Sequence, residues 1–399
     1  MANILLFFFF CLAANDYRVD ATTLPISTTE EDEIKRHLNL INKPPIRSFQ
    51  TEEGYIVDCI DIHKQPAFDH PFLKNHKLQR KPTFLGRRAH AFNYVTNKTL
   101  DFALEKLSCP KGYVPIRRTS KDDLINGIKT TSFAHHHFTQ SFPGNHVSNF
   151  LFLFGDAMIM DNREGGYMGV NGHINVYQPK VRKYQMSIAQ IAVQNGESDG
   201  INTILFGWQV SPQIYHNKLA HVFVLWTSDS FRTTGCYNMM CPGFIQTDPH
   251  FTIGLPIINL STYEGPQFEI SLSISRDSET KNWWLVAQNR HIGYFPAALF
   301  SNLSTANRIG WGGRVSGVMK GQSPPMGSGH FPDGDLTHAC FIRKISYVVS
   351  DGSTQEPVQD VPKLGGDNPQ CYGLKYFGFL DPQNRFTLQF GGPGGSCAT

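Results

Sequence analysis

The sequence predicts a mostly β protein, in which an antiparallel sandwich or barrel follows a smaller part that mixes α and β structure. From residue 150 onward, short aromatic and β-branched runs recur between clusters of Gly, Pro, Asn and Asp, with little helical periodicity. With 399 residues, 40% of them hydrophobic, the chain can bury a large core. Abundant Phe, Gly and Pro suit a β-rich globular protein rather than a disordered chain.

The part before residue 150 is predicted to contain one short helix and short strands. A capping pattern at 27–30 and apolar residues at helical spacing from Ile34 to Ile41 predict the helix. Strands are expected over 55–62 and 109–118. Residues 131–149 contain three consecutive histidines and a Pro-Gly pair, and we predict that they form a solvated linker.

The chain begins with an apolar run, Asn3 to Ala14, of the length of a secretory signal peptide. Small residues suit cleavage after Ala14 or Ala21, so residues 1–21 are predicted to be removed. The run is too short to span a bilayer, and we expect no membrane attachment after its removal. The sequence also contains three sequons for N-glycosylation, at Asn97, Asn259 and Asn302.

The cysteine count predicts a disulfide-bonded protein. Of eight cysteines, Cys11 lies in the predicted signal, so at most three disulfides and one free thiol remain. The sequence does not fix their connectivity. We expect three disulfides, namely Cys59–Cys109, Cys236–Cys241 and Cys371–Cys397. Cys340 would then be a buried free thiol.

Several function classes find no support in the sequence. A formal net charge of +3, without an aromatic and basic platform, gives no indication of nucleic-acid binding. The histidine triplet has no Cys, Asp or Glu at ligand spacing, so no metal is expected. The glycine-rich stretch at 391–396 follows a strand but opens no helix, which argues against a phosphate loop. We expect no cofactor, and the sequence does not predict an oligomeric state.

The strand predicted over 202–210 alternates in a way that assigns its two faces. One set of alternate residues is strongly apolar and is predicted to face the core: Ile204, Phe206, Trp208 and Val210. The other set is predicted to line any cleft that the sheet presents: Thr203, Leu205, Gly207 and Gln209.

Beyond these patterns, the chain resembles the neprosin family, which are secreted plant proteins with a cleavable activation segment and a catalytic β-sandwich. VDCIDIHKQPAFDHPFLKNHKLQ (57–79) and CPKGYVPIRR (109–118) resemble the activation segment. FGWQVSPQIY, WTSDSFRTTGCYN, CPGFIQTD, NWWL and MGSGHF resemble the catalytic domain, in the same order. The resemblance implies two antiparallel sheets of roughly seven strands each, with a cleft on a concave face. We therefore assign an activation segment to 22–130, a linker to 131–149 and the sandwich to 150–399.

Family members that act as peptidases are glutamic endopeptidases that cut beside proline. Their two glutamates face each other across the cleft, in segments of the type TIEAGWQV and GGEV. Here TILFGWQV places Leu205 at the first position, and WGGRV places Arg314 at the second. Leucine has no exchangeable proton, and arginine stays charged at physiological pH. Because catalytic groups that act as a unit fail together, we predict a catalytically inactive relative that binds peptide or cell-wall ligands.

Two alternatives remain open at this point. An active proline-directed endopeptidase would need relocated acids, and the candidates are Glu197, Asp199, Asp229, Glu264, Glu269 and Asp277. A carbohydrate-binding protein would need exposed tryptophans, although most tryptophans in sandwiches belong to the core. The candidates for cleft contacts are Gln209, Trp208, Arg314, Trp283 and Trp284. Trp283 and Trp284 are adjacent, so in a strand one faces inward and the other outward.

Arg314 is expected either to pair with a neighbouring acid or to anchor an anionic ligand group. The expected partners are a proline-rich peptide or a cell-wall glycan. The expected location is extracellular, in the apoplast or cell wall, or vacuolar. Residues 57–71 of the activation segment are expected to cover the cleft.

Overall fold

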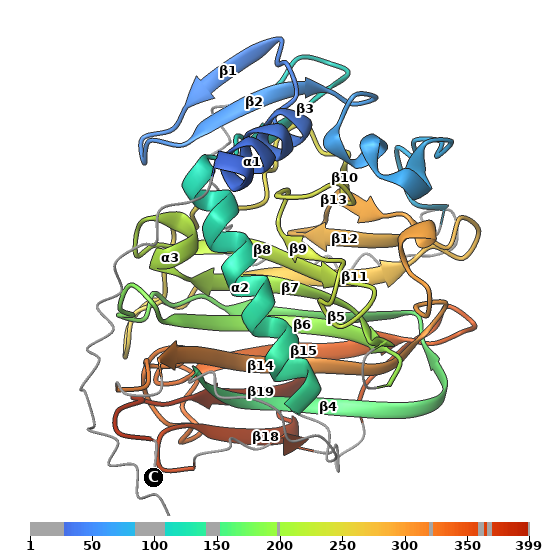
Figure 1. The fold of residues 1–399 in the computed structure, drawn as a ribbon. Coiled ribbons are helices and arrows are strands. Elements are labelled where there is room, and N and C mark those ends of the chain that lie inside the picture. The colour runs from blue at the N-terminus through green and yellow to red at the C-terminus, as the bar shows by residue number, and fades with distance from the viewer. Residues whose placement is uncertain are drawn as a thin grey trace, which may run out of the picture.

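The computed structural model describes residues 28–83, 108–140, 152–197, 200–318, 322–357, 363–364 and 369–397. The predicted signal peptide, the sequon at Asn97 and the candidate acid Asp199 lie outside the described residues. Two parts follow one another along the chain, an N-terminal part that mixes α and β structure and a large antiparallel β-sandwich (Figure 1).

The N-terminal part contains the predicted helix and strands. Its elements are α1 (Thr28–Ile41), β1 (Arg47–Gln50), β2 (Ile56–Asp61), the 3-10 helices η1 (Pro66–Asp69) and η2 (Pro71–Leu73), β3 (Tyr113–Arg117) and α2 (Lys121–Gln140). The three strands form one antiparallel sheet in the order β1-β2-β3. The predicted helix and both predicted strands are therefore present.

The predicted linker is wrong over residues 131–140, because α2 continues through them to Gln140. Ser120 and Asp123 start this helix with a reciprocal cap. The Asp123 backbone N–H donates to Ser120 Oγ at 3.0 Å, and the Ser120 N–H donates to Asp123 Oδ2 at 2.9 Å. No proline or glycine interrupts residues 128–140, so a polar composition did not prevent a helix. Residues 141–149 lie outside the described residues.

The sandwich consists of two sheets in which every strand pairing is antiparallel. The seven-stranded sheet has the order β17 (Lys363–Leu364), β4 (Phe152–Tyr167), β14 (Ala306–Val318), β6 (Met186–Asn195), β7 (Asn202–Val210), β8 (Ala220–Thr227) and β9 (Cys236–Tyr237). The nine-stranded sheet has the order β10 (Ile245–Gln246), β13 (Arg290–Phe295), β12 (Trp283–Ala287), β11 (Glu269–Arg276), β5 (Gly169–Asn175), β15 (Cys340–Val348), β19 (Phe386–Gly391) and β18 (Gly373–Phe379), with β16 (Thr354–Gln355) paired to β15. Two short helices complete the described elements, α3 (Pro212–Tyr215) and η5 (Ala297–Leu299).

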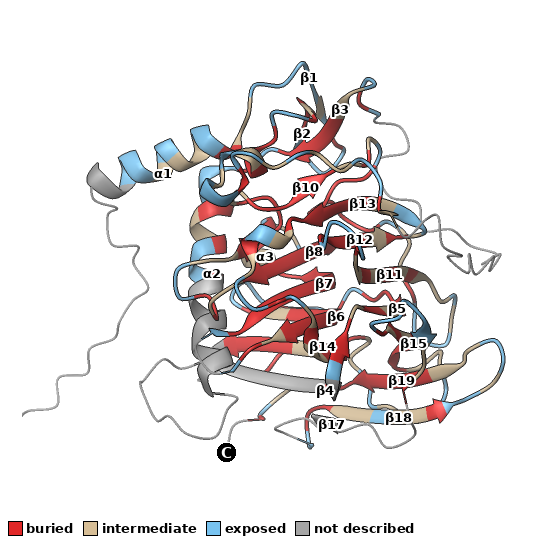
Figure 2. Cartoon of the chain, turned by 90° about the vertical axis from the view of Figure 1, so that its right-hand side faces the viewer, coloured by how far each residue is buried: buried red, intermediate tan, exposed pale blue. Residues whose placement is uncertain are grey.

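The main apolar core lies between the two sheets, where the strands of both are buried (Figure 2). The alternate residues of β7 that the pattern assigned to the core are fully buried in it: Ile204, Phe206, Trp208 and Val210. The fold class predicted from the strand pattern is confirmed. The opposite face of the seven-stranded sheet carries a second, smaller apolar cluster, which includes Leu205 and residues of α1 and α2.

The structure contains the three expected disulfides, and Cys340 is a buried free thiol. Cys59–Cys109 lies within the N-terminal part, whereas Cys236–Cys241 and Cys371–Cys397 lie within the sandwich. Among the described cysteines, none joins one part to the other. Apart from the chain itself, the two parts are thus held together by noncovalent contacts.

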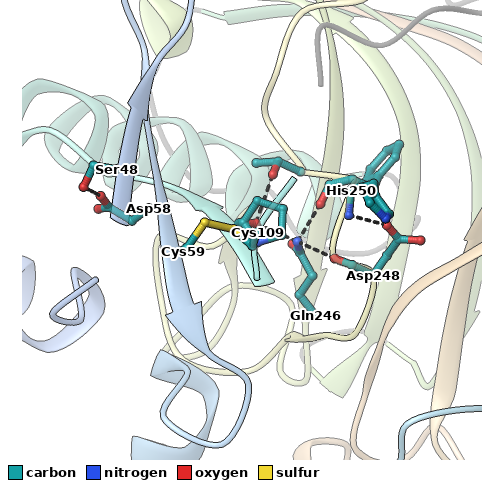
Figure 3. The surroundings of a disulfide bond; sticks show 10 residues. Ser48, Asp58, Cys59, Cys109, Gln246, Asp248 and His250 are labelled. Carbon is teal, nitrogen blue, oxygen red and sulfur yellow. Dashed lines mark hydrogen bonds between the residues drawn. A yellow bond between two sulfur atoms is a disulfide. The ribbon is translucent and has the colours of Figure 1, made fainter. Parts of the chain in front are cut away.

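Gln65 and Gln246 make one of these contacts. Gln65 Nε2 donates to the Gln246 carbonyl at 2.8 Å, and the Gln246 N–H donates to Gln65 Oε1 at 2.9 Å. Gln246 lies beside the Cys59–Cys109 disulfide (Figure 3), and its Nε2 donates to the Pro115 carbonyl at 2.6 Å. Residues 57–71 therefore pack at the β10 end of the nine-stranded sheet. The expectation that they cover the cleft is wrong, because Ile60, Ile62 and Ala67 join the main core instead.

Two further features bear on the predicted location. Asn302 is exposed and Asn259 is half-exposed, and both lie outside regular elements. In the described part of the chain, no helix is both long enough and apolar enough to cross a membrane.

Candidate functional site

The candidate site is the outer face of the seven-stranded sheet, which we call the Leu205 face. Strand register defines it by three rows of alternate residues: Leu205, Gly207 and Gln209 of β7, Ile188, Gln190 and Ala192 of β6, and Gly310, Gly312 and Arg314 of β14. Residues paired across strands project from the same side of a sheet. Leu205 and Arg314 therefore share one face, as the resemblance implied.

The register shows how these two positions lie relative to each other. Leu205 of β7 pairs with Ala192 of β6, which pairs in turn with Gly310 of β14. Arg314 of β14 pairs with Ile188 of β6, which pairs in turn with Gln209 of β7. Leu205 and Arg314 are thus two strands apart and offset by four residues, on the order of 15 Å between Cα atoms. The midpoint is Gln190, which is flanked in register by Gly207 and Gly312. The surface between the two positions is buried in the intact chain, since Gln190 is 1% exposed and a Cβ added at Gly207 would lie 1.9 Å from the Ala189 carbonyl oxygen.

Leu205 is shielded from solvent by the N-terminal part. It is 3% exposed and belongs to an apolar cluster with Phe223 and Leu225 of β8, Leu124 of α2 and Ile41 of α1. Helix α2 runs across this face of the sheet (Figure 1), and the turned view of Figure 2 places it alongside the same strands. Helices of the N-terminal part, α2 above all, therefore cover the Leu205 face.

Arg314 is half-buried and is a cationic residue of the Leu205 face. In the register of β14 and β4 it pairs with Asp156, whose side chain lies outside the described part. Burial raises the pKa of the Tyr237 phenol, and the positive charge of Arg314 acts in the opposite direction. The guanidinium is thus close enough to Tyr237 on β9 to lower the pKa of its phenol.

A buried polar cluster occupies the Gln209 end of the face. Gln209 Nε2 donates to the Tyr215 hydroxyl at 3.0 Å, and Asn238 Nδ2 donates to the same oxygen at 3.2 Å. The Tyr215 ring stacks on His221 with 3.8 Å between ring centroids. The Oε1 atoms of Gln209 and Gln190 are buried, and neither accepts a hydrogen bond from the described residues. Buried acceptors of this kind are normally satisfied, so these two are available for donors of a ligand or of water.

The N-terminal part closes this polar cluster with an ion pair. Arg117 of β3 is 8% exposed, and its Nη2 donates to Asp123 Oδ1 of α2 at 3.0 Å. The Arg117 guanidinium lies 4.4 Å from the Tyr55 ring centroid and 5.8 Å from that of Tyr215. The Tyr55 hydroxyl donates to the Tyr215 carbonyl at 3.0 Å. Strand β3 and helix α2 of the N-terminal part thus contact the sandwich at Tyr215, through the ion pair of Arg117 and Asp123 and through aromatic rings.

The relocated acids do not gather on the Leu205 face. Glu197 and Glu264 are exposed, and Asp229 accepts hydrogen bonds from Thr233 and Thr234 in its own loop. Glu269 lies on the other sheet, where Arg343 Nε donates to its Oε2 at 2.6 Å. Asp277 is buried and accepts hydrogen bonds from Thr83 of the N-terminal part and from its own loop. None of the described candidates is therefore placed to act opposite Leu205 or Arg314.

The tryptophans predicted as cleft contacts are fully buried, so that part of the site prediction is wrong. Trp208 and Trp283 belong to the sandwich core, where their indole N–H groups donate to the carbonyls of Asn175 and Leu303. Trp284 faces outward, as the alternation predicts, but residues of the N-terminal part cover it. Gln209 and Arg314 do lie on the Leu205 face. The described residues contain no group of His, Cys, Asp and Glu that could hold a metal ion.

Comparisons with known proteins agree with the two-part organisation. A family model described as Neprosin matches residues 183–393, and a model described as Neprosin activation peptide matches residues 48–149. The second match includes all of α2, together with the predicted linker.

Among solved structures, the chain is similar to scytalido-glutamic peptidase bound to a peptide-based transition-state analogue, with 10% identity and a TM-score of 0.34 over 59% of this chain and 96% of that chain. SCP-B, a member of the Eqolisin family of peptidases in complex with the tripeptide Ala-Ile-His, shows 10% identity and a TM-score of 0.31, with the same two coverages of 59% and 96%. CG-16, a homodimeric agglutinin from chicken liver, shows 8% identity and a TM-score of 0.22 over 40% of this chain and 92% of that chain.

Proposed function

This chain belongs to the neprosin family, and we propose that it is a secreted, peptidase-like protein that binds peptides on the Leu205 face without cleaving them. One observation carries this proposal. A buried leucine and an arginine stand at the two positions that the resemblance assigns to the glutamates of the family's peptidases.

The proposed loss of catalysis follows from proton chemistry. In a carboxylate pair, one member takes a proton from water and the other, kept protonated, polarises the carbonyl or donates to the leaving group. Leu205 can do neither, and Arg314 cannot act as a base at physiological pH. None of the sheet residues whose side chains are described places a carboxylate on this face, and the strand register puts one acid of β4, Asp156, opposite Arg314. Asp123 approaches it from α2, but it is already paired with Arg117.

The remaining polar groups favour a peptide with a carboxylate. Arg314 offers a planar cation that suits a carboxylate. Gln190 and Gln209 offer buried carbonyl oxygens, which suit backbone N–H donors. A proline-rich peptide ending in, or carrying, an acidic group would use both features. The buried tryptophans give no support to a carbohydrate platform on this face.

Access to the face requires displacement of α2. The two parts share no disulfide among the described cysteines, so cleavage between Gln140 and Phe152 would allow the N-terminal part to leave. Three disulfides and an exposed sequon at Asn302 suit the extracellular or vacuolar location that we propose.

Binding of an acidic, proline-rich peptide tests this function. A site-specific protease sequence inserted after Gly144 allows the full chain to be nicked, and calorimetry compares the intact and nicked forms. We expect measurable binding by the nicked form and weaker binding by the intact form. Arg314→Ala should lower the affinity of the nicked form roughly tenfold or more, as expected for loss of a charge-assisted hydrogen bond.

Arg182→Ala is the matched control, because it removes the same charge from an exposed position before β6. It should leave the affinity unchanged. Equal affinities of the parent and Arg314→Ala for every acidic peptide tested would remove Arg314 from the binding site. Absence of binding by the nicked parent would refute the proposed function.

A further inference from the structure

A second region of the sandwich contacts residues 76–83 of the N-terminal part. It lies on the outer face of the nine-stranded sheet, at β12 and β13, away from the Leu205 face. Trp283 and Trp284 are adjacent in β12 and therefore lie on opposite faces of the sheet, yet both are 0% exposed and both belong to the main apolar cluster. The Trp284 indole N–H is in contact with Gln79, which belongs to residues 76–83; this segment follows η2, and residues 76–79 form neither helix nor strand.

The Gln79 side chain is held at both of its polar ends. Its Oε1 accepts hydrogen bonds from three groups of the sandwich, which are Thr280 Oγ1 at 2.8 Å, Asn282 Nδ2 at 2.8 Å and Trp284 Nε1 at 3.2 Å. Its Nε2 donates to Asp277 Oδ2 at 3.0 Å. A set of three donors and one carboxylate acceptor fits a carboxamide and discriminates against a carboxylate, because Asp277 would repel it.

The same segment is held again on either side of Gln79. The Gln79 backbone N–H donates to the Tyr294 hydroxyl at 2.9 Å, and His76 Nε2 lies 2.8 Å from the same oxygen. Further along, the Thr83 N–H donates to Asp277 Oδ2 at 2.6 Å, and Thr83 Oγ1 donates to Asp277 Oδ1 at 2.7 Å. Side-chain and backbone contacts at three points along a short segment are typical of a bound peptide.

The loop that contains Asp277 fixes the position of its carboxylate. It is fully buried, and the N–H groups of Glu279 and Thr280 also donate to its Oδ1. Burial alone would raise the pKa of this carboxyl, but the hydrogen bonds from Thr83 and from its own loop bring it down to about 2. Asp277 is therefore a fixed anion whose acceptor sites point at the segment.

We propose that Asp277, Thr280, Asn282, Trp284 and Tyr294 form a second peptide-binding site, which we call the Gln79 site. Its ligand class is a short peptide that carries a glutamine followed by a threonine four residues later. In the intact chain, residues 76–83 occupy the site as a tethered ligand. When the N-terminal part leaves, the site becomes available to a separate peptide of the same pattern.

The test uses the full-length chain with its own ligand disabled. Gln79→Glu is nearly isosteric, and it places a carboxylate against Asp277. Hydrogen exchange should show at least tenfold faster exchange in residues 76–83 of this variant, with the sandwich strands unchanged. A labelled synthetic peptide of residues 76–83 should then bind the variant and not the parent, whose site is filled. Lys77→Gln, an exposed neighbour in the same segment, is the matched control and should behave like the parent.

Two further variants establish specificity. The same peptide with Glu in place of Gln should bind the opened chain at least tenfold more weakly, and Asn282→Ala added to Gln79→Glu should reduce binding to a similar degree. If Gln79→Glu does not fold, Thr83→Ala opens the segment from its other end. Arg314→Ala should not alter binding here, so this result is separable from that at the Leu205 face.

Two results would overturn the proposal. Unchanged exchange of residues 76–83 in Gln79→Glu would show that the glutamine contacts do not hold the segment. A released segment with no binding of the separate peptide would show that the Gln79 site is an internal packing contact alone.

Discussion

Replacement of Asp123 by Ala is expected to lower the free energy of unfolding by about 3–5 kcal/mol, because it strips Arg117 of its partner in a buried ion pair. Arg117 and Asp123 are 8% and 2% exposed, and no other described acid pairs with Arg117. Asp123 also caps the first turn of α2 through the Ser120 N–H, so the helix loses one end of its reciprocal cap. Urea denaturation of the parent and the variant measures the change.

Asp122→Ala is the matched control for this first prediction. Asp122 occupies the same first turn of α2 and carries the same charge, but it is exposed. Its loss should cost less than about 1 kcal/mol, the range of a helix-dipole interaction. Equal effects of the two substitutions would show that the buried pair contributes nothing beyond the helix start, contrary to our description of the contact.

Introduction of the family's first glutamate, Leu205→Glu, is expected to destabilise the intact chain by about 3–5 kcal/mol at neutral pH, because it buries a charge without a partner. Leu205 belongs to the same apolar cluster as Leu124 of α2, so the new carboxyl would lie among apolar side chains. Burial raises its pKa in the folded state above the ordinary value of about 4.3. A raised folded-state pKa means that the variant is least destabilised at acid pH and loses stability as pH rises through that value.

Denaturation at pH 3.5 to 8 measures this second prediction, with Leu205→Gln as the control. Glutamine has nearly the same shape and cannot ionise in this range. The difference in stability between the Glu and Gln variants should be small at the acid end and should grow toward neutrality. A difference that does not change with pH would mean that position 205 is accessible to water under α2.

The sequence was sufficient for the architecture because its strongest signals are local. The alternation in β7 identified its core-facing residues, and the strand runs after residue 150 identified an antiparallel sandwich. The extension of α2 through residues 131–140 was not predictable from a local sequence pattern. Residues 131–140 are polar, and composition alone does not reveal that an N-terminal cap starts a helix which then runs across a sheet.

The site was predictable only in part. The resemblance identified positions 205 and 314, and alternation placed Leu205 and Gln209 on one face. The contacts of Gln209 with Tyr215, and of Tyr215 with Asn238, were missed, because they depend on the turn after β7 and on the pairing of β7 with β8 and β9. Trp284 shows a related limit. Its outward direction follows from alternation, whereas its burial depends on residues 76–83, which are distant in the sequence.

The most direct test of the central claim is a cleavage assay on the nicked full-length chain. The protein is incubated with a proline-rich polypeptide between pH 2 and pH 8, and the products are identified by mass spectrometry. We predict no cleavage above that of a heat-inactivated sample at any pH. Cleavage beside proline that disappears when an acid near the Leu205 face is replaced, for example in Asp156→Asn, would contradict the proposal that this sheet has lost its acid–base pair.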